Sequence, residues 1–249
     1  MPTPSAAPDD HTGLAWDRCQ AVLLDLDGVI TPTAVIHERA WAELFADFGY
    51  TSDDYLAYID GKPRYDGVAS FLASRGIELP WGDPSDPPGD GTVCALGNRK
   101  NELFNAILAR DHLAPYPGTV AVLELLDRLG VDQAVVSSSK NARTVLEAAG
   151  MAGRFPVIVD GNTAVEESLP GKPAPDMFRH AAALLGAEAE ACVVVEDAVA
   201  GVAAGVAGDF GFVLGVDRGG NREALEAAGA DLVVEDLQET VLATDGRRC

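Results

Sequence analysis

A series of short apolar runs, each ending abruptly in polar residues, constrains the fold of this sequence more than any other feature. The runs are continuous, not alternating, which is typical of strands buried on both faces of a parallel sheet. Segments with apolar residues at helical spacing lie between them, and several stop at a glycine. Strand–helix alternation of this kind predicts a doubly wound, Rossmann-like α/β fold with a parallel sheet. The runs lie at residues 21–24, 133–136, 155–159, 191–195, 212–216 and, more weakly, 231–234, and the helical segments at 119–129, 141–149, 176–185, 199–206 and 222–228.

One long section, residues 33–114, breaks this alternation because it contains helical patterns and no apolar strand run. Within it, residues 80–91 are dense in Pro, Gly and Asp, which is typical of a loop. We therefore predict a helical domain that is inserted into the α/β core directly after its first strand. Its helical patterns lie at residues 38–48, 67–74 and 100–110.

The α/β core would then consist of residues 18–32 and 115–249. Residues 1–17 are rich in Pro, Ala and Asp and contain no apolar signal core, so they predict a disordered tail. The sequence has no apolar stretch of about 18 residues, the length needed to span a membrane. We expect a cytoplasmic protein that binds no membrane and acts as a monomer.

The composition is strongly acidic, with 39 Asp and Glu residues against 18 Lys and Arg residues and a formal net charge of -21. Such a surface repels nucleic acid and anionic membranes, and no run of Lys and Arg reverses this locally. We therefore exclude a nucleic-acid partner. The same field would oppose an anionic substrate, so a phosphate site in this protein needs local cations or a metal ion.

Polar side chains that can do chemistry follow three of the apolar runs. In open parallel sheets, ligands bind at the carboxyl ends of the strands. We therefore expect these side chains to meet at one edge of the sheet, joined by a lysine from the loop 171–176 just before a helix. The candidates are Asp25, Asp27, Ser137, Ser138, Ser139, Lys172, Glu196 and Asp197.

Four carboxylates at neighbouring strand ends would repel one another strongly unless a cation neutralises them. Oxygen-only sites suit a hard ion, and Mg²⁺ prefers one or two carboxylates, several waters and a phosphate. No His or Cys stands at these strand ends, which argues against zinc or copper. The sequence also lacks GxxxxGK[ST], and no GxGxxG follows the first strand. We predict Mg²⁺ as the cofactor and a phosphorylated small molecule as the substrate.

The remaining candidates fit phosphate chemistry. Serine hydroxyls and backbone N–H groups at a helix start can hold phosphate oxygens, and Lys172 supplies a compact positive charge. Asp25 can serve as a covalent nucleophile, while Asp27 can give a proton to the leaving oxygen and take one back. Taken alone, each Asp could be a turn former and Lys172 an ordinary loop lysine. Their joint occurrence at successive strand ends favours a catalytic site.

These residues resemble the motifs of the haloacid dehalogenase-like phosphatases and mutases. The segment 25–29, Asp-Leu-Asp-Gly-Val, is similar to the first family motif, Ser137 to the second, Lys172 to the third, and Glu196-Asp197 to the fourth. Four motifs in this order are highly specific, and the resemblance covers the chain from about residue 20. It implies a helical cap domain and a Mg²⁺ ion held by the Asp25 carboxylate, the Asp27 backbone carbonyl and Asp197, with Glu196 nearby.

Within this superfamily the chain is most similar to the β-phosphoglucomutases, over residues 28–41, 137–141 and 171–176. The resemblance implies that His37 couples cap closure to the position of Asp27, and that Thr33 lies at the hinge where the cap begins. It also implies which residues hold the two phosphate groups of a sugar bisphosphate. Ser137, Ser138 and Lys172 would hold the transferring group, and the substrate contacts would be Thr33, His37, Arg64, Lys100, Ser138, Ser139, Lys140 and Asn141.

By this resemblance the first functional hypothesis is an isomerase that converts β-D-glucose 1-phosphate to glucose 6-phosphate, with Asp25 phosphorylated in each cycle. A sugar-phosphate phosphatase of the same fold remains open, since it needs only water at Asp25. A non-catalytic binding domain is disfavoured because every motif residue is present. The loop 80–91 and the sequence Tyr65-Asp66-Gly67 depart from the usual cap pattern and leave the natural sugar open.

Overall fold

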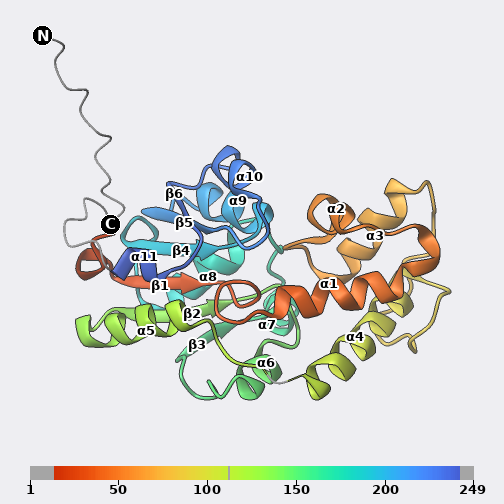
Figure 1. Ribbon diagram of the computed structural model, residues 1–249, viewed down its shortest axis with the longest axis horizontal. Coiled ribbons are helices and arrows are strands. Elements are labelled where there is room, and N and C mark those ends of the chain that lie inside the picture. The colour runs from red at the N-terminus through yellow and green to blue at the C-terminus, as the bar shows by residue number, and fades with distance from the viewer. Residues whose placement is uncertain (1–13, 112, 242–249) are drawn as a thin grey trace, which may run out of the picture.

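A computed structural model describes residues 14–111 and 113–241 of the chain. Within these residues, a six-stranded sheet has the order β3-β2-β1-β4-β5-β6 (Figure 1), and all of its strand pairs are parallel. The order reverses between β1 and β4, and ligands bind outside such a switch point in open sheets. The predicted parallel sheet is therefore confirmed. The strands are β1 (Ala21–Leu24), β2 (Asp132–Val136), β3 (Val157–Val159), β4 (Cys192–Glu196), β5 (Phe212–Val216) and β6 (Leu232–Val234).

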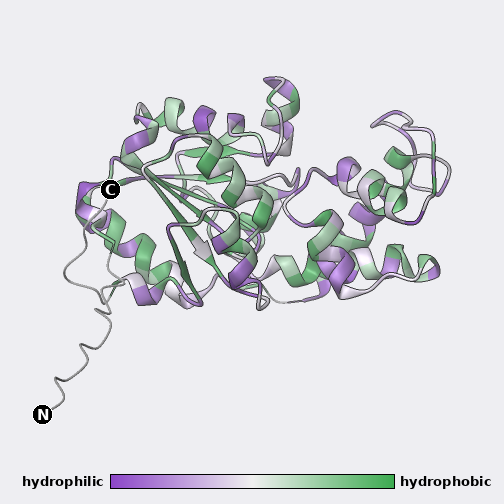
Figure 2. Ribbon diagram, turned by 90° about the horizontal axis from the view of Figure 1, so that it is seen from above, coloured by the Kyte–Doolittle hydropathy of each residue, from purple (hydrophilic) through white to green (hydrophobic). Residues whose placement is uncertain are grey.

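Strand β1 illustrates why the apolar runs are continuous. Ala21 and Leu23 join the apolar cluster on one face of the sheet, while Val22 and Leu24 join the cluster on the other, and all four are fully buried. Helices cover both faces, so the apolar strands lie in the middle of three layers (Figure 2). The helices over one face are α5 (Pro117–Leu129), α6 (Ala142–Ala148) and α11 (Gln238–Val241), and those over the other are α7 (Gly161–Glu166), α8 (Asp176–Leu185), α9 (Val199–Ala207) and α10 (Arg222–Ala227).

Helix ends in the core follow the glycine and capping signals. Helices α5 and α8 both end at a glycine in the left-handed conformation, Gly130 and Gly186, each at φ 70°. Only glycine adopts this conformation without a steric cost, so it commonly ends a helix. Helix α7 was not predicted from the sequence. It begins because the Asp160 carboxylate accepts the backbone N–H groups of Asn162 and Thr163.

The helical block lies beyond the carboxyl end of the sheet, beside β1 (Figure 1). Its helices pack around an apolar cluster of their own, in which the rings of Phe45 and Phe71 stack with centroids 4.1 Å apart. Its predicted helical character is confirmed, and no strand lies between residues 33 and 111. The division into domains at residues 33 and 114 stays a prediction. The helices are α1 (Thr33–Leu44), α2 (Ser52–Asp54), a π-helical turn at Tyr55–Ile59, α3 (Arg64–Ser74) and α4 (Val93–Arg110).

The predicted loop at residues 80–91 contains no helix or strand and precedes α4. Thr92 caps α4 by accepting the backbone N–H of Ala95 at 3.0 Å, so α4 starts earlier than the helical pattern indicated. The prediction of a tail over residues 1–17 is wrong at its end, because Leu14 and Trp16 are buried in the core of the sheet. Residues 1–13 lie outside the described residues. Among the described helices, none has both the length and the apolar character that a membrane span requires.

Candidate active site

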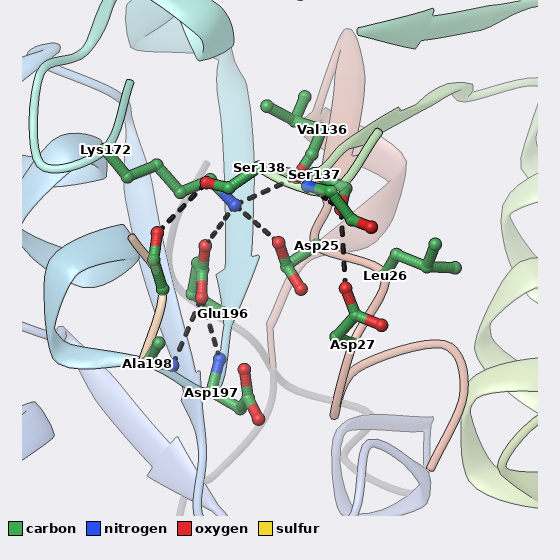
Figure 3. A network of polar contacts seen from close by, with 12 residues as sticks. Asp25, Leu26, Asp27, Val136, Ser137, Ser138, Lys172, Glu196, Asp197 and Ala198 are labelled. Atoms are coloured by element: carbon green, nitrogen blue, oxygen red, sulfur yellow. Dashed lines mark hydrogen bonds and ion pairs between the residues drawn. The ribbon is translucent and has the colours of Figure 1, made fainter. Parts of the chain in front are cut away.

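Three buried carboxylates meet where β1 and β4 end (Figure 3). Asp25 directly follows β1, Glu196 is the last residue of β4, and Asp197 follows it. The two strands are neighbours, and the Asp25 N–H donates to the Val195 carbonyl at 2.9 Å. One oxygen from each carboxylate lies within 4.8 Å of the others. The strand ends thus bring together the acidic residues that the sequence predicted.

Gly28 makes room for Asp197 in this cluster. Its φ of 89° lies in the region that side chains rarely adopt, and a Cβ at this position would lie 1.7 Å from Asp197 Oδ2. Any larger residue would therefore displace the Asp197 carboxylate. The segment that follows β1 and the carboxylate that follows β4 are consequently packed against each other at this point.

Lys172 is the positive charge at the centre of the cluster. Its Nζ lies 2.5 Å from Asp25 Oδ1, 2.6 Å from Glu196 Oε1 and 2.9 Å from the Val136 carbonyl oxygen. An ammonium group has three protons, so these contacts use all of them. Although burial opposes its charge, the two carboxylates raise the pKa of Lys172 above its usual value. The predicted contact of Lys172 with a phosphoryl group would require it to exchange one of these partners.

Glu196 is also fully engaged. Its Oε1 accepts from Lys172, while its Oε2 accepts the backbone N–H groups of Asp197 and Ala198, both at 3.1 Å. Gly201 lies against the same side chain, since a Cβ there would fall 1.8 Å from Glu196 Oε1. Glu196 is therefore placed to hold Lys172 and the start of the following loop, which leaves Asp25 and Asp197 as the carboxylates with oxygens to spare.

The cluster carries more negative charge than Lys172 can balance. Burial raises the pKa of Asp25 well above its usual value, even though the Lys172 charge lowers it. Burial also raises the pKa of Asp197, and the charges of Asp60 and Asp25 add to this effect. Buried carboxylates in this situation either hold a proton or bind a cation. The donors are all oxygens, so the residues fit Mg²⁺, which Asp25 and Asp197 would hold.

Asp27 lies beside this cluster and is held in its ionised form. The Thr33 hydroxyl donates to its Oδ1, His37 Nε2 lies 3.4 Å from the same oxygen, and the Ser137 hydroxyl donates to Oδ2 at 3.4 Å. Burial alone would raise the pKa of Asp27, but His37 and the Thr33 hydrogen bond outweigh it and lower the pKa to about 2. At neutral pH, Asp27 is therefore a base.

His37 connects Asp27 to the helical block. The Nζ of Lys100, on α4, contacts His37 Nδ1. Burial and the Arg64 charge lower the pKa of Lys100 well below its usual value. When Lys100 donates to Nδ1, the proton of a neutral His37 lies on Nε2, the nitrogen nearest to Asp27. Burial and the Lys100 charge lower the pKa of His37, which favours this neutral form. The His37 ring stacks on Phe104 with centroids 4.2 Å apart.

A cavity of about 390 Å³ separates the sheet edge from the helical block. Asp25, Asp27 and Asp197 line it, together with cations from both parts of the chain, Arg64 and Lys100 from the helical block and Lys140 from the core. This volume is within the usual range for small-molecule sites. The remaining predicted substrate contacts that line it are His37, Ser138 and Ser139.

Besides Lys172, three predicted residues do not line the cavity. Thr33 is fully buried and donates to Asp27, so its side chain is placed to hold Asp27 and does not face the cavity where a substrate was predicted to contact it. Ser137 is also fully buried, and its hydroxyl is shared between Asp27 and the Ser139 N–H. Asn141 instead donates to Asn101 Oδ1 at 2.6 Å. Because side-chain direction decides these cases, motif position alone could not reveal them.

Two further residues at or near the cavity, Asn101 and Asp60, were missed by sequence reasoning. Asn101 Oδ1 also accepts from Arg64 Nη2 at 2.7 Å, so it joins α3 and α4 to the loop after β2. Asp60 is a further acid that faces the cavity from the helical block. Burial and the Glu196 charge raise the pKa of Asp60 to about 7. Asp60 follows no strand, and its only sequence signal is its place directly before Gly61-Lys62-Pro63-Arg64.

Comparisons with known proteins agree with this geometry. The sequence model of the haloacid dehalogenase-like hydrolases matches residues 19–209. The β-phosphoglucomutase of Mycobacterium tuberculosis is 45% identical over 90% of this chain and 92% of its own length. Hexitol phosphatase A of Escherichia coli is 29% identical over 89% of this chain and 93% of its own. A crystal structure of β-phosphoglucomutase from Clostridium difficile superposes with a TM-score of 0.73 at 25% identity, covering 89% of this chain and 92% of the other.

Proposed function

This chain belongs to the haloacid dehalogenase-like hydrolase family and is an enzyme, and from that premise we propose that it is a Mg²⁺-dependent β-phosphoglucomutase. Its substrate would be β-D-glucose 1-phosphate and its product glucose 6-phosphate. The observation that carries the proposal is Asp25, which Lys172 fixes through one carboxylate oxygen while it faces a cavity lined by cations. The 45% identity to a β-phosphoglucomutase supports the choice of substrate.

The nucleophile in this proposal is the second oxygen of Asp25. Lys172 holds Oδ1, so Oδ2 is the oxygen available to attack phosphorus and form an acyl phosphate. When bound by Asp25, Asp197 and the Asp27 carbonyl, Mg²⁺ would supply charge neutralisation for the phosphoryl group. The bond between phosphorus and the sugar oxygen breaks as the acyl phosphate forms.

Asp27 would accept a proton from one sugar oxygen and donate it to the other. In the phosphorylated enzyme, the ionised Asp27 removes the proton from the 6-hydroxyl of β-D-glucose 1-phosphate as that oxygen attacks the phosphoryl group on Asp25. Asp25 is then free, and the product of this step is the 1,6-bisphosphate. When Asp25 attacks the phosphate at carbon 1, Asp27 returns the proton to the departing oxygen. The low pKa of Asp27 supports a cycle in which it acts first as a base.

A mutase also needs a second phosphate position, for the phosphate that is not being transferred. Arg64 and Lys140 line the cavity, and their positive charges would bind the phosphate at this position. Asn101 holds the Arg64 guanidinium, and the Lys140 ammonium lies 5.8 Å from the ring centroid of Tyr65. Because the protein as a whole repels anions, these local cations are necessary for a bisphosphate to be held.

The contact between the helical block and the core supports a mutase over a hydrolase. The Ser138 hydroxyl donates to the Gly61 carbonyl at 3.0 Å. A Cβ on Gly61 would lie 3.1 Å from Ala198 Cβ, and one on Gly171 would lie 2.6 Å from Pro63 Cγ. The segment before Arg64 is thus packed directly on the core loops. Such closure keeps water away from an acyl phosphate while the bisphosphate turns over.

A phosphatase is the second candidate, favoured by the 29% identity to hexitol phosphatase A. One assay separates the two functions. The protein is mixed with Mg²⁺, β-D-glucose 1-phosphate and a trace of glucose 1,6-bisphosphate, and the products are followed by phosphorus NMR. We expect glucose 6-phosphate as the main product. Release of inorganic phosphate with no glucose 6-phosphate would refute the mutase and support the phosphatase.

A further inference from the structure

The loop Asp217–Asn221, between β5 and α10, touches both acidic segments of the site although it contains none of the predicted site residues. It lies beyond residues 19–209, the part of the chain that the family match covers. The loop is fixed internally, since Asp217 Oδ1 accepts the backbone N–H groups of Gly220 at 2.7 Å and Asn221 at 3.0 Å. Because its own backbone is fixed, this loop can also fix the positions of the residues that it contacts.

Arg218 binds the segment that follows β1. Its Nε donates to the Gly28 carbonyl at 2.8 Å, and its Nη1 donates to the Glu235 carbonyl at 2.9 Å. The guanidinium also stacks on Tyr116, 3.7 Å from the ring centroid. Only 18% of the side chain is exposed. Arg218 therefore links Gly28 to the far edge of the sheet through a rigid and largely buried group.

Asn221 binds the segment that follows β4, because its Nδ2 donates to the Asp197 carbonyl at 3.1 Å. One short loop thus holds Gly28 through Arg218 and Asp197 through Asn221. These are the two residues whose close approach leaves no room for a Cβ. The loop consequently fixes the spacing between the two acidic segments through contacts that do not involve Lys172.

The same two side chains are not fully satisfied. Within the described part of the chain, Arg218 Nη2 and Asn221 Oδ1 are buried and have no hydrogen-bond partner. A buried polar atom without a partner destabilises the fold, because it loses its hydrogen bonds to water. Apolar residues of similar size would avoid this cost, so stability alone does not account for a polar pair at these positions. What Arg218 and Asn221 do provide is one hydrogen bond each to the acidic segments, to the Gly28 carbonyl and to the Asp197 carbonyl.

We propose that Arg218 and Asn221 are positioning residues that set the spacing between Gly28 and Asp197, and thereby the affinity of the site for a divalent cation. They would touch neither the substrate nor the cation. This inference rests on the proposed Mg²⁺-dependent function. It assigns a role in the metal site to a loop that carries none of the four family motifs.

The test is a calorimetric titration of the full chain with Mg²⁺, in the absence of substrate. Groups that orient metal ligands typically contribute 10- to 100-fold to metal affinity. We expect Arg218→Met to weaken Mg²⁺ binding by about this factor, and Arg218→Lys, which can still donate to Gly28, to recover part of it. At saturating Mg²⁺, kcat of Arg218→Met should return to the parent value, since the proposal places Arg218 in contact with neither the substrate nor the cation.

The matched control is Arg222→Met. Arg222 lies on the adjoining helix and donates to the Val233 carbonyl at 2.6 Å, so its loss removes a comparable bond away from the acidic segments. Its Mg²⁺ affinity should equal that of the parent protein. Equal affinities in Arg218→Met and Arg222→Met would overturn the inference.

Two further outcomes are separable. If the parent protein does not bind Mg²⁺, the proposed metal-dependent function fails, and the inference fails with it. If Arg218→Met does not fold, Asn221→Ala, which removes one hydrogen bond at a partly exposed position, gives the same comparison. It should weaken Mg²⁺ binding by about tenfold, and unchanged affinity in that variant would also overturn the inference.

Discussion

The Nζ of Lys172 lies 2.5 Å from Oδ1 of Asp25, although 147 positions separate the two residues in the chain. The same nitrogen bonds Glu196 and the Val136 carbonyl, so its direction is fixed from three sides. Asp25 is thereby oriented through one oxygen and left with the other to react. This arrangement is the basis of the nucleophile assignment.

Asp25→Asn should abolish turnover and leave the fold intact. The variant keeps the shape of the side chain but removes the nucleophilic oxygen, and loss of a nucleophile typically costs at least about 1,000-fold in rate. Since burial raises the pKa of Asp25, its ionised form is costly in the metal-free protein. The variant should therefore unfold at a higher temperature than the parent in EDTA.

The control for this variant is Asp132→Asn, a change of the same kind at an exposed position at the start of β2. It should leave both turnover and melting temperature unchanged. Turnover by Asp25→Asn at the parent rate would show that another group attacks phosphorus.

Thr33→Val should make Asp27 a weaker acid. The hydroxyl of Thr33 stabilises the ionised carboxylate, whose pKa is about 2. Hydrogen bonds to charged groups contribute about 1.5–3 kcal/mol, so the pKa should rise by about 1 to 2 units. The acid limb of the pH–rate profile should move upward by that amount. Thr33→Ser keeps the hydroxyl and should show the parent profile, and identical profiles in both variants would contradict the assignment.

Arg64→Ala should separate mutase flux from simple ester hydrolysis. The Arg64 guanidinium lines the cavity and would hold the phosphate that is not being transferred. Its loss should lower mutase flux by about 10- to 100-fold, given the strength of hydrogen bonds to charged groups. Hydrolysis of p-nitrophenyl phosphate, which has one phosphate, should change little. Arg99→Ala removes an exposed ion pair with Asp90 on the same helical block and is the control.

An equal loss of both activities in Arg64→Ala would argue against a second phosphate position at this residue. Mutase flux in Arg99→Ala should match the parent, because that side chain does not line the cavity.

Asp60→Asn should change how the stability of the metal-free protein depends on pH. The folded-state pKa of Asp60 is about 7, whereas an unfolded Asp has a pKa of about 3.9. Between these values the folded state binds the extra proton, so ionisation of Asp60 destabilises the fold progressively as pH rises to about 7. In EDTA, Asp60→Asn should be more stable than the parent at pH 8, and this difference should shrink towards pH 5.

The measurement is the free energy of unfolding in urea at both pH values. Asp53→Asn, an exposed position on the same helical block, is the control and should follow the parent at each pH. A stability difference between Asp60→Asn and the parent that does not change with pH would contradict the assignment.

The sheet could be predicted from the sequence because strands buried on both faces must be continuously apolar. Strand β1 and helix α8 have the bounds that the pattern indicated. The gathering of Asp25, Glu196 and Asp197 followed from the same reasoning, since carboxyl ends of parallel strands meet at one edge. Helix α7 could not be predicted, because it depends on side-chain bonds from Asp160 and not on apolar spacing.

The roles of individual polar residues were harder to predict than the fact that they meet at one edge of the sheet. Thr33 and Ser137 were expected to contact substrate, but each turns its hydroxyl towards Asp27. Arg218 gave no sequence signal, since its contact with Gly28 joins loops 190 residues apart. Asp60 was missed because it lies in the helical block, where no strand end marks it. Such roles depend on tertiary contacts between segments, and local pattern does not encode them.

The central claim, that Asp25 becomes phosphorylated, can be tested directly by peptide mass spectrometry. The protein is incubated with Mg²⁺ and glucose 1,6-bisphosphate, quenched in acid, reduced with borohydride to trap any acyl phosphate, and digested. We predict that the trapped site is Asp25, and that Asp25→Asn and the EDTA-treated parent give no label. A label on any other residue, or turnover without a trapped acyl phosphate, would contradict the account.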